Sequence, residues 1–235
     1  MAIFQDNKGY PVESHNDGGD SSMRAGMGTL SGLNWPKPFN LADFEIQWGW
    51  MTRHPTQPVW SSPLNSSRDQ LVPYLAGLNQ IGRNDVIRRL AAWHLMRLGL
   101  CQNFQRDKPG TWKLPYPSTY VNDRGETVTK AFDFADPTLP NHWWCFIKGG
   151  HLYPLYVLYP ICLLFALLSI YSSIGTGKEQ NQVIAEMSFH PTWMMRLYVK
   201  WNPSWNENNA LYWVSRGEKE YSDAIADYVN KRCLQ

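Results

Sequence analysis

The chain has 235 residues, a formal net charge of +2 and only 18% charged residues. Because its basic residues are neither in excess nor clustered, the composition argues against a nucleic-acid partner. The length allows a substantial core in one large domain or two small ones. The 12 Trp, 12 Tyr and 9 Phe suit a large core, a protein interface or a sugar-stacking surface, so they favour no single function.

The cysteines and the N-terminal residues indicate the cellular compartment in which such a protein is made. Four cysteines are far apart and include no Cys-x-x-Cys pair: Cys101, Cys145, Cys162 and Cys233. This spacing favours reduced structural thiols in a cytosolic product over a disulfide or zinc framework. Residues 1–19 read as an irregular arm, and their polar start contains no apolar run like that of a signal peptide.

Helical signals follow the arm. Asp20, Ser21 or Ser22 can cap a helix that runs to about Leu30, and its glycines suit a place where another helix crosses closely. Three more helices are expected before residue 101, namely 41–51 capped by Asn40, 68–80 bent at Pro73, and 85–100 capped by Asn84.

The helical signal disappears between Gln102 and Pro140. A long loop of this kind is uncommon inside a compact domain and usually serves function or binding. Within it, residues 119–129 have the pattern of a small β-hairpin around a turn at 122–125. Asn141 then caps a helical turn.

The apolar stretch 152–174 is central to the predicted fold. No Asp, Glu, Lys or Arg occurs between Lys148 and Lys178, and a helix that is apolar on every side is buried in protein or in lipid. Pro154 and Pro160 leave an unbroken helix of roughly 22 Å, which is short of a hydrocarbon core of about 30 Å. We therefore expect a buried central helix, with a membrane-contacting segment as the alternative.

Three further helices are expected, at 182–189, from Pro191 onward and at 218–232. The chain is thus predicted to be mostly α, a single helical domain over 1–235 built as a compact multi-helix array around the apolar helix.

The first candidate site is the segment 15–24, which contains Asp-Gly-Gly-Asp-Ser. Its glycines place Asp17 and Asp20 in a tight bend at a helix N-terminus, where the helix dipole favours carboxylates. In a functional interpretation one aspartate acts as an acid or base, or His15 binds a cation together with both aspartates. In a structural one Asp20 caps the helix and Arg24, one turn later, neutralises it.

Two other clusters are weaker. Arg53 and His54 precede a loop that ends in Ser-Ser-Arg-Asp-Gln at 66–70, which is close to a capping box. A third cluster consists of Asp133, Asp136, His142, Lys148 and His151. A glycosidase needs two carboxylates about 5 to 9.5 Å apart. For an enzyme, the catalytic candidates are Asp17, Asp20 and Asp69, and the substrate-binding candidates are Arg24, Arg68, His54 and His142. No metal or cofactor motif is complete.

Four segments resemble those shared by a poorly characterised family of tailed-bacteriophage and prophage proteins: 17–21 with Arg24, 67–71, 140–147 and 158–160. The resemblance spans roughly residues 15 to 170. It implies a helical plan similar to an (α/α) toroid, the architecture of several polysaccharide hydrolases and lyases, which is an analogy of fold and not of reaction.

Two functions remain open at this stage. The first is a virion- or tail-associated protein, made in the host cytoplasm, whose aromatic-rich surface binds other phage structural proteins and allows oligomers. The second is a carbohydrate-acting hydrolase or lyase that acts on host surface polysaccharide. Neither expectation includes a cofactor, a nucleic-acid partner or a membrane partner.

Overall fold

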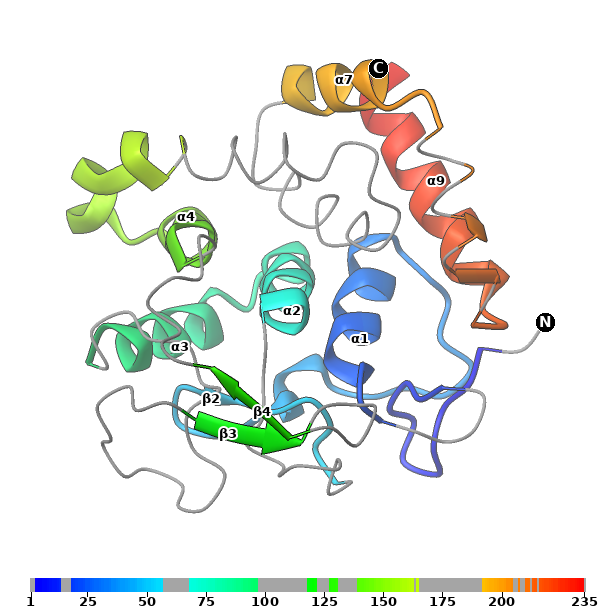
Figure 1. The fold of residues 1–235 in the computed structure, drawn as a ribbon, viewed down its shortest axis with the longest axis horizontal. Helices are drawn as coiled ribbons and strands as arrows, with labels where there is room; N and C mark the ends of the chain where they lie inside the picture. Colours follow the sequence, from blue (N-terminus) through cyan, green and yellow to red (C-terminus); the bar gives the residue numbers. More distant parts are fainter. Residues whose placement is uncertain are drawn as a thin grey trace.

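The computed structural model describes residues 3–13, 18–56, 68–96, 118–121, 127–130, 139–162, 164, 192–204, 207, 210–211, 213–214 and 216–234. This part of the chain is mostly helical, as predicted, with two short antiparallel hairpins (Figure 1). Among the helices that can be assigned in these ranges, none is both long enough and apolar enough to cross a bilayer.

The closest helix pair is formed by α1 (Ser21–Leu30) and α2 (Arg68–Gln80), whose bounds match the predicted ones. A Cβ atom added to Gly26 would lie 2.3 Å from the backbone oxygen of Pro73, far inside van der Waals contact. Gly77 approaches the backbone of Gly26 from the other side, where its added Cβ would meet an oxygen at 2.8 Å. This confirms the expectation that α1 carries glycine where a helix crosses it.

The central helix of the described fold is α2. Every residue from Gln70 to Leu78 is buried, and α2 contacts α1, α3 (Asn84–Met96) and α4 (Leu139–Gly149). Figure 1 shows it between α1 on one side and the α3–α4 pair on the other. Burial on all sides, which hydropathy predicted for the apolar stretch, is therefore found here.

The described start of the predicted central helix lies at the surface instead. Pro154 stands in the first turn of a 3₁₀ helix, η4 (Tyr153–Leu158), because proline suits a first turn but lacks the N–H that a longer helix needs. The side chains of Val157 and Ile161 are 79% and 58% exposed. Cys162 is buried, and residues 165–174 lie outside the described ranges.

The predicted helix at 41–51 is wrong beyond its first turn. Asn40 does cap a 3₁₀ helix, η1 (Leu41–Phe44), by accepting from the Ala42 amide at 3.0 Å. The chain then forms the hairpin β1 (Glu45–Gln47) and β2 (Trp50–Met51). Gly49 has a φ of +70° in its turn and donates its amide to Glu45 Oε1 at 2.7 Å, so the helix cannot continue.

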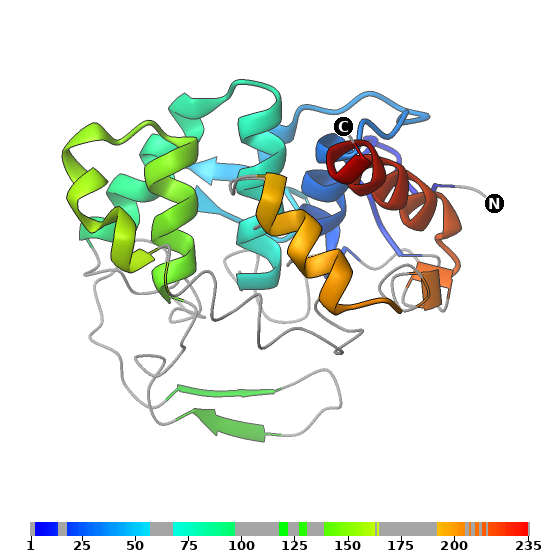
Figure 2. The same cartoon turned by 90° about the horizontal axis from the view of Figure 1, so that it is seen from above.

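The predicted cap at Asn141 is wrong, because α4 begins at Leu139 and Asn141 lies inside the helix. Three other predicted elements are confirmed. The hairpin at 119–129 is present as β3 (Ser118–Val121) paired with β4 (Thr127–Lys130). Helices α7 (Thr192–Trp201) and α9 (Lys219–Leu234) occur where the last two helices were expected. The two pack on each other, and α9 also contacts α1 (Figures 1 and 2). The predicted helix at 182–189 lies outside the described residues.

Candidate functional site

Two of the sequence clusters meet at the start of α1. Gln70, in the first turn of α2, donates its amide nitrogen to Asp20 Oδ1 at 2.8 Å. Its amide oxygen accepts from the Ser22 hydroxyl at 2.6 Å and from the Met23 amide at 3.3 Å. One side chain therefore satisfies two donors at the beginning of α1 and fixes Asp20, whose own side chain makes no capping hydrogen bond.

Arg24 is the buried centre of the same region. Its Nε donates to both carboxylate oxygens of Glu218, at 3.0 and 2.9 Å, and its Nη2 donates to Glu13 at 3.1 Å. The guanidinium carbon lies 5.9 Å from the ring centroid of Trp213. Arg24 was expected to pair with Asp20 directly, but its hydrogen bonds go to two acids from other parts of the chain, Glu218 and Glu13.

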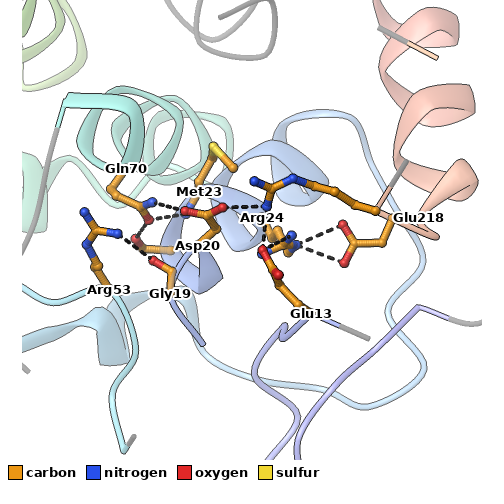
Figure 3. A network of polar contacts seen from close by, with 10 residues as sticks. Glu13, Gly19, Asp20, Met23, Arg24, Arg53, Gln70 and Glu218 are labelled. Carbon is orange, nitrogen blue, oxygen red and sulfur yellow. Dashed lines mark hydrogen bonds and ion pairs between the residues drawn. The ribbon is translucent and has the colours of Figure 1, made fainter. Parts of the chain in front are cut away.

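Arg216 binds two carboxylates on the more exposed side of this region. Its Nη1 donates to Glu13 Oε1 at 2.5 Å and to Asp20 Oδ2 at 2.7 Å. Arg53 donates to the Gly19 carbonyl at 3.1 Å and accepts the Ser22 amide at its own carbonyl. We call this group the Arg24 network, and Figure 3 shows most of it from close by. Its members are Glu13, Asp20, Ser22, Arg24, Arg53, Gln70, Arg216 and Glu218.

The charges of the Arg24 network balance, since three carboxylates face three guanidinium groups. Burial opposes ionisation of Asp20, but Arg24 and Arg216 outweigh it and hold its pKa below the ordinary value. Burial raises the pKa of Glu218, with Arg24 opposing that rise. Paired and hydrogen-bonded in this way, buried charges are tolerated without a ligand, so the arrangement first of all joins the N-terminal arm to α1, α2 and α9.

His54 lies in a separate buried contact. Its Nε2 is 3.4 Å from Asp6 Oδ2, and its Nδ1 accepts the Thr56 amide at 3.2 Å. The ring packs edge-on against Tyr10, with centroids 5.5 Å apart. Burial lowers the pKa of His54, and Asp6 offsets this only in part. The side chain is fully enclosed, so it faces protein and not a substrate.

The other predicted site residues are placed only in part. Asp17 lies outside the described residues; Arg68 and Asp69 are in the first turn of α2 and His142 is in α4, with side chains that are not described. Their roles stay predictions. In the described ranges, no three His, Cys, Asp or Glu side chains are grouped so that they could hold a metal ion.

Sequence reasoning missed Glu13, Arg216 and Glu218. Arg216 and Glu218 flank Gly217, which has a φ of +73° and ends the turn before α9. A charged pair around a glycine has the pattern of an ordinary surface turn. Nothing local indicates that Arg216 pairs with Glu13 and Asp20, or Glu218 with Arg24, near the other end of the chain.

Comparisons of the chain with protein-family models, with curated proteins and with solved structures found no match.

Proposed function

We propose that this chain is a bacteriophage virion- or tail-associated protein that binds neighbouring subunits through an exposed apolar surface. The single observation behind the proposal is a run of exposed apolar side chains that begins in η4. We call it the Tyr153–Leu164 surface, and its exposed members are Tyr153, Tyr156, Val157, Leu158, Ile161 and Leu164. A soluble monomer rarely exposes so many large apolar groups together, and such patches mark interaction sites.

The tyrosines give this surface a fixed shape. A 3₁₀ helix has three residues per turn, so side chains three apart line up. The rings of Tyr153 and Tyr156 are stacked 5.6 Å apart, and those of Tyr156 and Tyr159 repeat this spacing. Aromatic groups held in place lose little entropy when a partner binds, and tyrosine is enriched in protein interfaces.

The Arg24 network supports a non-enzymatic role. Asp20, Glu13 and Glu218 each accept from at least one arginine. A carboxylate held in an ion pair with a lowered pKa, like Asp20, is a poor proton donor at neutral pH. These features suit a network that stabilises the fold better than a catalytic acid–base pair.

Mass spectrometry of purified phage particles tests the proposal. We expect the chain at a fixed ratio to known structural proteins, retained after density-gradient purification and a high-salt wash. Its absence from particles that were assembled while the chain was being expressed would overturn the virion assignment.

A second candidate is the carbohydrate-acting hydrolase or lyase. Glu13 Oε1 and Asp20 Oδ2 bind the same Arg216 nitrogen, at 2.5 and 2.7 Å, so they lie at most about 5 Å apart, close to the carboxylate spacing of retaining glycosidases. Consecutive helices from α1 to α4 contact each other, and α2 also contacts α4. The (α/α)-toroid-like plan itself rests on the family resemblance.

That candidate has its own test. Asp20→Asn and Glu13→Gln should each abolish release of reducing ends from host capsule or lipopolysaccharide, with the far-UV circular dichroism unchanged. If the unsubstituted chain releases no sugar from either polymer, or if both variants keep full activity, the carboxylate pair has no catalytic role.

A further inference from the structure

The exposed side of α7 carries two parallel rows of side chains. Residues four apart in a helix lie along one ridge. One ridge holds Trp193, the half-buried Leu197 and Trp201, and the neighbouring ridge holds Arg196 and Lys200. The two tryptophans are 56% and 54% exposed, while Tyr198, on the opposite side, is buried. We call this face the α7 Trp–Arg strip.

Among the described residues, none neutralises the cations of this strip. No ion pair or hydrogen bond joins Arg196 or Lys200 to any residue that the structure describes, and α7 itself contains no acidic residue. The exposed acids of the adjacent helix α9 are already engaged: Asp223 pairs with Lys219 at 2.7 Å, and Asp227 pairs with Lys231. Within the described part of the chain, the charge of the strip is therefore left to pair with an external anion.

From this arrangement we propose that the α7 Trp–Arg strip binds an acidic polysaccharide. Sugar rings lie against the indoles of Trp193 and Trp201, whose flat apolar faces suit the C–H face of a pyranose. Carboxylate groups along the same chain pair with Arg196 and Lys200. The tryptophans are eight residues apart, or about 12 Å along the helix, so the ligand is an extended chain and not a single sugar.

Two features favour this ligand over other anions. Nucleic acids are bound through many phosphate contacts, whereas the strip offers two cations in a chain of net charge +2. Lipid anchoring needs a wide apolar face in addition to positive charge, whereas among the described side chains of α7 only Trp193 and Trp201 are both apolar and exposed. The helix lies at the edge of the molecule in Figure 1 and near the middle of the view in Figure 2, and it packs on α9. Its exposed residues are therefore on the outside of the described fold, where a long polymer can reach them.

Isothermal titration calorimetry with polygalacturonate oligosaccharides tests the inference. Trp193→Ala and Trp201→Ala should each weaken binding by about tenfold. Arg196→Gln combined with Lys200→Gln should weaken it similarly and remove most of its salt dependence. Trp48→Ala is the matched aromatic control, since Trp48 is 51% exposed but lies in the β1–β2 turn. Lys219→Gln is the matched charge control.

Each comparison ligand separates the inference from a competing one. Methyl-esterified polygalacturonate keeps the rings without charge and should bind more weakly than the acid form. If poly-glutamate binds as tightly as polygalacturonate, the strip recognises negative charge alone and not sugar rings. If phosphatidylglycerol vesicles or oligo-dT bind more tightly, the ligand of the strip is a lipid surface or a nucleic acid. The inference is overturned if the methyl ester binds as tightly as the acid form, if poly-glutamate binds equally well, or if the vesicles or oligo-dT bind more tightly. No binding of polygalacturonate, or an equal loss in the control variants, also overturns it. None of them bears on whether the chain is found in virions, because the Tyr153–Leu164 surface is left unchanged.

Discussion

Arg24 and Glu218 lie 194 residues apart in the chain and form a buried pair in which one guanidinium nitrogen donates to both carboxylate oxygens. Their side chains are 0% and 1% exposed. The pair holds the start of α9 against α1, and Glu13 adds the N-terminal arm through the same guanidinium. The N-terminal arm and the start of α9 are thereby both fixed to α1.

Glu218→Gln should lower the free energy of unfolding by about 3 kcal/mol, because it leaves the Arg24 charge buried without its main partner. Urea denaturation followed by tryptophan fluorescence measures this. Lys219→Gln, which breaks the exposed pair with Asp223, is the control and should leave the midpoint unchanged. Equal midpoints for the two variants would contradict the role assigned to the buried pair.

Gly26→Ala should destabilise the fold by about 3 kcal/mol, which is the upper part of the usual range for overpacking. The added methyl would meet the backbone of Pro73 at 2.3 Å, and backbone cannot move aside as a flexible side chain can. The control is Thr29→Ala in the same helix, a half-buried position where atoms are removed and not added. The midpoints of thermal unfolding of both variants test this prediction. A Gly26→Ala protein as stable as the control would mean that α1 and α2 pack less closely than described.

Local signals were enough to predict much of the fold. The bounds of α2, the Asn40 cap and the β3–β4 hairpin were all predicted correctly, because caps, glycines and turn residues act over a few positions. Hydropathy was less informative. It correctly found that 152–174 lacks charge, but a lack of charge does not say what covers a segment. The central helix is α2, where small residues such as Ala76 and Gly77 allow close packing.

The site was harder to predict for a geometric reason. Asp20 and Arg24 are four apart, which suggested a direct pair. Asp20, however, has the non-helical backbone of an N-cap, with φ −113° and ψ 18°, so its side chain does not follow the helix face. Its partners come from α2 and from the turn before α9. Contacts between residues so far apart in the chain cannot be predicted from a single sequence.

The stability of the protein should fall as the pH is lowered from about 7 to about 5, with His54 as one cause. Burial lowers the pKa of His54 in the folded state. As the pH falls through about 6.5, the unfolded chain therefore takes up a proton that the folded chain resists, and unfolding becomes easier. His54→Asn should flatten this slope in urea titrations. His151→Asn, which changes an exposed histidine, should keep it; the same slope in both variants would exclude His54 as the cause.

The Tyr153–Leu164 surface gives a prediction in which stability and binding separate. Val157→Ser combined with Ile161→Ser should leave the free energy of unfolding within about 0.5 kcal/mol, because both side chains are largely exposed. The same double variant should be incorporated poorly when it complements particles that lack the chain, as measured by quantitative mass spectrometry. Ile81→Ser is the control, since Ile81 is 48% exposed at the end of α2 and away from η4. Normal incorporation of the double variant would remove this surface from the interface, whereas a large loss of stability would mean that it packs within the fold.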